Sequence, residues 1–257
     1  MISPKCLSQL LLAWVLVFSG CAGRKDYVIL SGGPALRTWE NYRIPKDQHD
    51  RYWGNFIKSA RIRIDQLRHT EGQDFPITWM VYRPGYETRQ REDAVRRPPD
   101  LCSTEEITSL AASRGTRLVW FDDSDKVIQY LNQHSGGKLA GFEYFGHSNM
   151  FAFLFDYSND ILGVSSSYLH SLDLKKLRHG IFVRNAQVKS WGCNTGDYMS
   201  RVWKNETGHA MIGAAKVLDA SGNVLVDASG NLLSGKTDYS AISDGLSLPT
   251  VSGRWVE

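Results

Sequence analysis

The sequence lacks a marked excess of charge of either sign. Its 30 Lys and Arg residues nearly balance its 27 Asp and Glu residues, which leaves a formal net charge of +3 over 257 residues. Because nucleic-acid binding depends on clustered positive charge, this balance gives no reason to expect nucleic acid as a partner. The chain also lacks a glycine-rich phosphate loop, since "SGGPA" at residues 31–35 has the spacing of neither common fingerprint.

The chain has no pattern of metal ligands either. The histidines at positions 49, 69, 134, 170, 179 and 209 show no ligand spacing with each other or with pairs of cysteines. In the tail, the acidic residues around the two "DASGN" stretches, at 219 and 227, are too sparse for a calcium loop. We therefore predict no metal and no cofactor.

No apolar run is long enough to cross a membrane. The run "LLLAWVLVF", at residues 10–18, is well short of the roughly 20 residues that a spanning helix needs. It follows Lys5 and precedes "FSGC", which ends at Cys21. This arrangement resembles a bacterial lipoprotein signal, although Phe18 stands where that pattern prefers Leu. An ordinary secretory signal that is cut elsewhere is the alternative.

The lipoprotein resemblance implies an anchored protein with its body in water. Residues 1–20 would be the signal peptide, cleavage would precede Cys21, and that residue would carry palmitate and other lipid chains on a tether of residues 21–26. We expect the bacterial cell envelope as the location, with the outer membrane favoured because Ala22 does not resemble an inner-membrane retention signal. The sequence indicates no oligomeric state.

The remaining chain alternates apolar runs with helical periodicities, which predicts an α/β fold with a mainly parallel sheet. We expect one domain over residues 27–217. Strands are expected at 26–33, 76–82, 116–121, 139–147, 186–193 and 209–217, with a further strand or hairpin arm at 150–158. Helices are expected at 51–67, 103–113, 124–134, 165–180 and 197–208, and an exposed Arg-rich and Pro-rich loop at 83–100. A small β extension with two tight turns follows at 218–257.

Two of the expected strands end in reactive side chains. His147 follows "GFEYFG" and Cys193 follows "VKSWG". Ligands bind in the crevice at the carboxyl ends of parallel strands, so an imidazole and a thiol can share that crevice if the strands are neighbours. A thiolate is a strong nucleophile, and a nearby imidazole can take its proton and later protonate a leaving amine.

The order of these motifs resembles the caspase-like cysteine peptidases, and "CNTG" at residues 193–196 is most similar to their CHAT-domain branch. In that family a hydrophobic strand ends in His and a second, about 50 residues on, ends in Cys; here the separation is 46 residues. The resemblance implies a caspase-like three-layer sandwich and peptide or protein substrates. It makes Cys193 the nucleophile and His147 the general acid–base residue.

The same resemblance places the oxyanion hole at the backbone N–H groups of Ser148 and Cys193. The family usually has Gly where this chain has Ser148, and Ala where it has Gly192. A serine amide can donate equally well, but a backbone that demands glycine would be strained. Two alternatives stay open: a catalytically inactive binding module of the same fold, and a cysteine amidase or acyltransferase that acts on cell-wall material.

Three local features have two interpretations each. Cys102 and Cys193 are the cysteines left after lipidation, and they are expected to be free, with a disulfide between them as the alternative. The stretch from Arg83 to Arg97 is expected to be a solvated loop, with a processing site or a lipid-headgroup contact as the alternative. Asp197 is expected to cap the following helix, although it could instead favour a basic side chain in a specificity pocket.

Overall fold

The computed structural model describes residues 25–34, 54–94, 102–156 and 167–221, and within the tail residues 223, 225, 228, 235, 237–238, 250–251 and 254–257. The expected signal peptide and Cys21 lie outside these residues. Among the residues described, no helix is both long enough and apolar enough to cross a bilayer.

The centre of the molecule is a five-stranded sheet in which every neighbouring pair is parallel. In spatial order its strands are β3 (Arg117–Phe121), β2 (Ile77–Tyr82), β1 (Asp26–Ser31), β4 (Leu139–Phe145) and β8 (Phe182–Ser190). All residues of β1 and β2 are buried, as expected for strands covered on both faces. Their sequences, DYVILS and ITWMVY, are therefore mostly apolar, which is why the sequence predicts them well.

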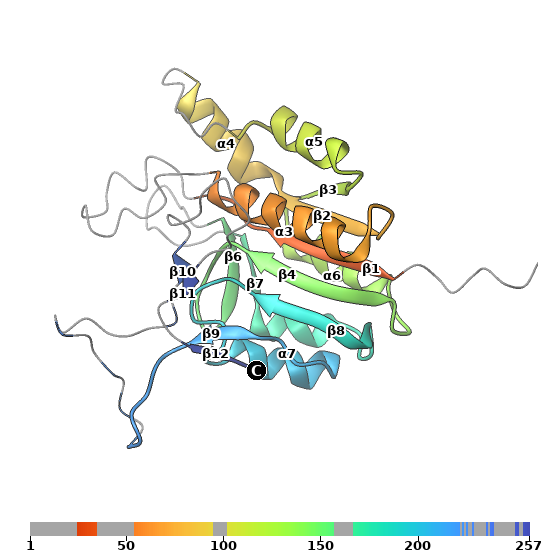
Figure 1. Ribbon diagram of the computed structural model, residues 1–257. Helices are drawn as coiled ribbons and strands as arrows, with labels where there is room; N and C mark the ends of the chain where they lie inside the picture. The colour runs from red at the N-terminus through yellow and green to blue at the C-terminus, as the bar shows by residue number, and fades with distance from the viewer. Residues whose placement is uncertain are drawn as a thin grey trace, which may run out of the picture.

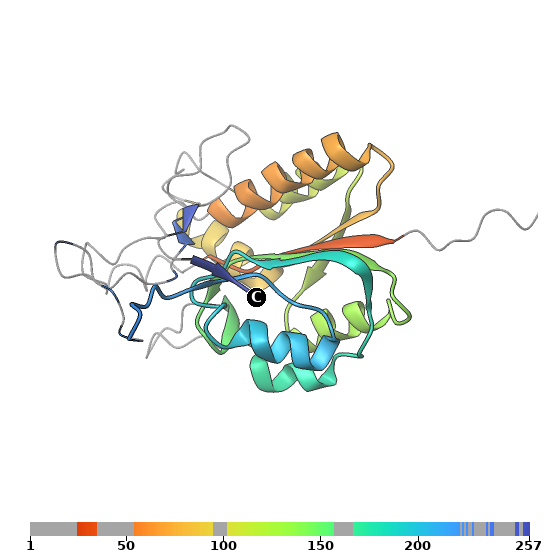
Figure 2. The ribbon, with the colours of Figure 1, turned by 60° about the horizontal axis from the view of Figure 1, so that its bottom comes forward.

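Helices cover both faces of this sheet, so the fold is a three-layer α/β sandwich (Figures 1 and 2). The first layer holds α3 (Asn55–Glu71) and α5 (Thr104–Ser113), while α4 (Arg83–Asp93) continues directly from the end of β2. The second layer holds α6 (Ser124–Asn132), the 3-10 helix η2 (Ser171–Lys176) and α7 (Met199–Thr207). The expected α/β sandwich with a mainly parallel sheet is confirmed.

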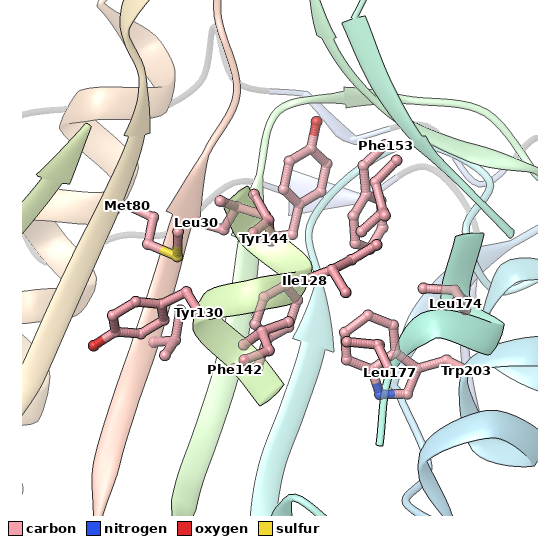
Figure 3. Packing of buried hydrophobic residues seen from close by; sticks show 14 of the residues in the cluster. Leu30, Met80, Ile128, Tyr130, Phe142, Tyr144, Phe153, Leu174, Leu177 and Trp203 are labelled. Atoms are coloured by element: carbon pink, nitrogen blue, oxygen red, sulfur yellow. The ribbon is translucent and has the colours of Figure 1, made fainter. Parts of the chain in front are cut away.

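The alternation of side chains along β1 supplies both cores. Tyr27 and Ile29 pack with α3 and α5 on one face, whereas Val28 and Leu30 pack with α6 and α7 on the other. Figure 3 shows the second core, in which the ring of Trp203 from α7 stacks on Phe142 of β4 with 5.0 Å between centroids. The sheet is therefore held rigidly between two apolar layers.

A second, antiparallel sheet consists of β5 (His147–Ser148), β6 (Ala152–Asp156) and β7 (Ser167–His170). The expected hairpin arm at 150–158 corresponds to β6. The helix expected at 165–180 is wrong, because the chain forms β7 and then η2. His170 ends the strand by accepting the N–H of Leu172 on its ring, while Asp173 accepts the N–H of His170, and this reciprocal cap starts a short 3-10 helix instead.

The loop expected at 83–100 is also wrong over its first part, where α4 forms. Pro84 is tolerated there because it lies in the first helical turn. The helix also has a buried side: Tyr86 is fully buried and donates to the carbonyl of Gly32, and Arg89 is only 2% exposed. Because the stretch is rich in charged residues, the sequence did not indicate that these two side chains would be buried. Residues 95–101 lie outside the described part of the chain.

The tail forms two small antiparallel pairs, which confirms the expected β-rich extension. β9 (Gly213–Ala215) pairs with β12 (Arg254–Val256), and β10 (Thr237–Asp238) pairs with β11 (Thr250–Val251). β9 is much shorter than the expected strand at 209–217. Asp219 accepts the N–H groups of Ser221 and Asn223 and so forms the first expected tight turn. Of the second "DASGN" stretch, the structure describes Ala228 alone.

Candidate functional site

The strand order places a topological switch point at the carboxyl ends of β1 and β4. From β3 at the sheet edge, the chain crosses back to β4 on the other side of β1, so these two strands form a topological switch point, where open α/β sheets bind ligands. β8 is the next neighbour of β4. The segments that follow β4 and β8 carry His147 and Cys193, so both candidate residues belong to this end of the sheet.

His147 lies just beyond β4 rather than at its end. The strand stops at Phe145, and after Gly146 the chain enters β5, where His147 pairs with Leu154 of β6. The hydroxyl of Tyr144 donates to the carbonyl of His147 at 2.6 Å and fixes this turn. Gly146 is required here, because a Cβ at that position would lie 2.2 Å from the same hydroxyl oxygen. The half-buried His147 ring meets the ring of Phe56 edge-on, with 5.0 Å between centroids.

Cys193 lies in a turn of residues 191–195, which we call the cysteine turn. Its first residue continues the strand pairing, since Trp191 donates its N–H to the carbonyl of Tyr144 at 2.8 Å. Asn194 has a φ of 59°, and it is the one residue other than glycine with a positive φ in the described chain. Left-handed backbone disfavours most side chains but tolerates Asn. The tight reversal leaves Cys193 half-buried, whereas Cys102 is buried in the core; both are free, so they form no disulfide.

The cysteine turn and β5 are in direct contact. The Ser148 hydroxyl donates to the carbonyl of Cys193 at 2.7 Å. Burial, and after it the nearby charge of Cys193, raises the pKa of Tyr144 well above that of an ordinary tyrosine. The same hydroxyl that bonds to His147 therefore lies within electrostatic range of Cys193, and it stays protonated as a donor.

The two positions that differ from the pattern of caspase-like peptidases, Ser148 and Gly192, meet at this contact. A Cβ on Gly192 would lie 2.2 Å from the Ser148 Oγ and 2.8 Å from its Cβ. The serine side chain thus fills the space that an alanine at 192 would need. Ser148 has no positive φ, so this position does not demand glycine and the serine is not strained there.

The backbone N–H of Ser148 points away from β6. At the end of the hairpin, Asn149 donates its N–H to the carbonyl of Ala152, so these two residues form a hydrogen-bonded pair. Because hydrogen-bonded and non-bonded pairs alternate in antiparallel strands, the next pair, Ser148 with Phe153, is a non-bonded one. The Ser148 N–H therefore points outward from the hairpin and is not used in pairing with β6.

No family of known proteins, curated protein or solved structure matches the chain. The resemblance to caspase-like peptidases accordingly remains a prediction from short motifs.

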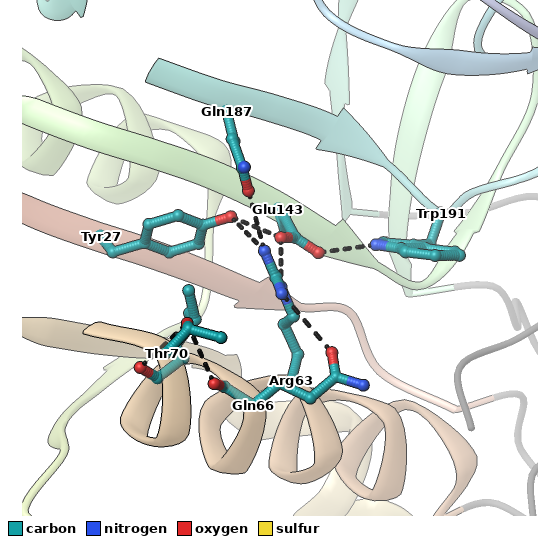
Figure 4. Close-up of polar contacts among 8 residues, drawn as sticks. Tyr27, Arg63, Gln66, Thr70, Glu143, Gln187 and Trp191 are labelled. Atoms are coloured by element: carbon teal, nitrogen blue, oxygen red, sulfur yellow. Dashed lines mark hydrogen bonds and ion pairs between the residues drawn. The ribbon is translucent and has the colours of Figure 1, made fainter. Parts of the chain in front are cut away.

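A buried polar network between α3 and the sheet holds Trp191, the first residue of the cysteine turn (Figure 4). The Glu143 side chain, 2% exposed in the middle of β4, accepts from Trp191 Nε1 at 2.7 Å and from Arg63 Nε at 2.6 Å, and also from the Tyr27 hydroxyl. Trp191 is further held by Lys189, whose Nζ lies 3.6 Å from its ring centroid. Burial lowers the pKa of Lys189, against the opposing effect of Glu143.

Sequence reasoning missed this network, although one signal was available. Glu143 is an acidic residue inside the apolar stretch "GFEYF", and a buried carboxylate requires partners. Those partners come from β1, α3 and the cysteine turn, so they could be named only once the strand order and the position of α3 were known.

Asp197 does not cap α7, so the expected cap is wrong. The residue in the N-cap position is Tyr198, and no side chain bonds to the helix end there. Asp197 Oδ1 instead accepts the N–H of Lys216 at 3.1 Å and connects the segment after the cysteine turn to the residue that follows β9. Within the described part of the chain, no three His, Cys, Asp or Glu residues form a group that could hold a metal ion.

Proposed function

We propose that the protein is a cysteine peptidase of the caspase-like kind, in which His147 and Cys193 form the catalytic dyad. The observation that supports this best is the hydrogen bond from Ser148 Oγ to the carbonyl of Cys193. It joins the residue after the histidine to the cysteine itself, at the end of the sheet where ligands bind. We further propose that lipid on Cys21 holds this domain at the bacterial envelope.

In the proposed reaction the Cys193 thiolate attacks the carbonyl carbon of a peptide bond, and a C–S bond forms. The tetrahedral intermediate collapses, the C–N bond breaks, and the protonated imidazole of His147 gives its proton to the leaving amine. Water then attacks the thioester while His147 takes a proton from it. The C–S bond breaks, the acid product leaves, and the thiolate and imidazolium are restored.

The oxyanion of each intermediate would be stabilised by backbone N–H groups of Ser148 and Cys193. The outward direction of the Ser148 N–H supports this role, because that donor is not engaged in strand pairing with β6. The hydrogen bond between its side chain and Cys193 would hold the two donors in a fixed relation. Such preorganisation matters because donors must already be placed when the charge develops.

The proposal is tested by incubating the full chain with a peptide library and with cell-wall fragments, and following products by mass spectrometry. Peptide cleavage that is lost in both Cys193→Ala and His147→Asn is expected. Cys102→Ala and His69→Ala are the matched controls and should keep the activity, because Cys102 is buried in the core and His69 is exposed near the end of α3.

Other outcomes distinguish the remaining functions. Products from cell-wall fragments alone, with the same dependence on Cys193 and His147, would favour an amidase or acyltransferase. Peptide cleavage that persists in Cys193→Ala would contradict the dyad. No products from either substrate set, with the wild type or with a variant whose tail no longer contacts Cys193, would favour a binding module of the same fold.

A further inference from the structure

The tail of the chain contacts the proposed nucleophile itself. The backbone N–H of Thr237 donates to the Sγ of Cys193 at 3.3 Å. One residue further along the cysteine turn, the N–H of Asn194 donates to the carbonyl of Gly235 at 2.6 Å. We call Gly235, Thr237 and Asp238 the strap. In Figure 1 its strand β10 lies at the carboxyl ends of β4 and β8, where the crevice is expected.

The strap is firmly placed at one end. Gly235 is buried, and a Cβ there would lie 2.6 Å from the carbonyl carbon of Ala214 and from the amide nitrogen of Ala215. Thr237 and Asp238 pair with β11. The strap is therefore packed against the backbone of β9 and paired with β11, and these contacts fix its position next to the sulfur.

Two residues that form this contact through their backbones also carry buried side-chain polar atoms without partners. Thr237 Oγ1 and Asn194 Oδ1 are buried, and neither has a hydrogen-bond partner among the described residues. Buried polar atoms without partners destabilise a contact. Two such atoms at one small interface favour a strap that can be exchanged for another ligand over permanent core packing.

We propose that the strap is an autoinhibitory segment, which occupies the place of an extended peptide at Cys193 and must leave before substrate can reach the sulfur. Its backbone groups meet the cysteine turn as those of a bound peptide strand would, through one N–H and one carbonyl. The inference rests on the proposed function for its purpose, and it adds extended peptide backbone as the form in which substrate binds.

Alkylation of Cys193 by iodoacetamide measures coverage of the sulfur without requiring catalysis. The rate is followed against pH on the full chain, and peptide mapping identifies the modified cysteine. The limiting rate at high pH reports access, and the midpoint reports stabilisation of the thiolate. Thr237→Pro removes the N–H donor, so we expect a limiting rate about tenfold higher, on the scale of one lost hydrogen bond, and a midpoint at higher pH.

Two further variants separate the strap from general effects. Gly235→Val keeps the Thr237 N–H but forces the strap off the backbone of Ala214 and Ala215, so it should raise the limiting rate as well. Leu225→Pro is the control, because it removes a different tail hydrogen bond, from Leu225 to the carbonyl of Val217, and should leave the rate unchanged. Buried Cys102 should stay unreactive in every variant.

If the limiting alkylation rate of Cys193 does not change in Thr237→Pro and Gly235→Val, the proposal that the strap covers the sulfur is overturned. Equal increases in the rates of Cys193 and Cys102 would overturn it as well, because they indicate unfolding. Failure of the proposed function looks different. Faster alkylation of the strap variants, with no peptide cleavage by any variant, would support the strap and refute the peptidase. Peptide cleavage by the wild type, with unchanged alkylation in the variants, would support the peptidase and refute the strap.

Discussion

Ser148 and Gly192 are complementary in size, because the serine side chain fills the space that a side chain at position 192 would need. The serine hydroxyl holds the carbonyl of Cys193 and occupies the space beside Gly192. Considered one at a time in the sequence, each residue differs from the pattern of caspase-like peptidases. Their complementarity could not be predicted, because residues 44 positions apart are brought together only by the pairing of β4 with β8.

This pair predicts strong coupling in a double-mutant cycle. Gly192→Ala alone should destabilise the fold by about 1–3 kcal/mol, because the new methyl overlaps the Ser148 side chain. Ser148→Gly alone should cost about 1 kcal/mol through the lost hydrogen bond. The double variant should be more stable than the sum of the two losses, because the serine no longer obstructs the methyl. Urea unfolding measures all three, and simple additivity would contradict the contact.

Asn194 provides a second test at this scale, because its φ of 59° is a property of the backbone alone. Asn194→Ala should lower the free energy of unfolding by about 1–2 kcal/mol, since alanine disfavours the left-handed region. Asn194→Gly should be nearly neutral, because glycine accepts that region without steric cost. Equal losses in both variants would show that the side chain, and not the backbone conformation, holds the turn.

Among the helices and strands, the sequence predicted those in which burial alone determines the pattern of apolar residues. Strands β1 and β2 are buried on both faces and are mostly apolar, and α3 has a clear apolar face that includes Phe56 and Ile64. Ser103 was expected to begin α5, and its side chain does accept the N–H of Glu106. In these cases local sequence and tertiary packing favour the same structure.

The elements that were missed owe their form to a few tertiary or capping contacts. α4 is strongly polar, and two buried residues, Tyr86 and Arg89, anchor it within a stretch whose charge indicates a loop. Residues 165–180 have apolar residues at helical spacing, yet Leu169 belongs to a strand that pairs with β6. Single-sequence patterns do not contain these partners.

The network around Glu143 gives a prediction for β4 and α3 together. Glu143→Gln should destabilise the fold by about 3 kcal/mol, the lower part of the range for breaking a buried pair, because the 17% exposed Arg63 side chain keeps some solvent. Glu87→Gln is the matched control, since its pair with Arg83 is exposed and should contribute less than about 0.5 kcal/mol. Urea unfolding compares them, and equal effects would contradict a structural role for Glu143.

For the molecule as a whole, the strand order explains where the site lies. The switch between β1 and β4, with β8 beside them, brings two segments from distant parts of the sequence to one edge, and the tail returns to the same edge through β10. Sequence reasoning selected His147 and Cys193 as candidates because each follows an apolar strand. It could not identify the strap, since Thr237 contacts the sulfur through its backbone N–H, which every residue except proline carries.

The pairing of His147 with Cys193 is tested by the pH dependence of Cys193 alkylation in the wild type and in His147→Asn, with His69→Ala as the control. An unperturbed cysteine titrates near pH 8.5. If the imidazole stabilises the thiolate, the wild-type midpoint lies below this value and moves upward in His147→Asn, while His69→Ala leaves it in place. The same midpoint in the wild type and in His147→Asn would contradict the dyad.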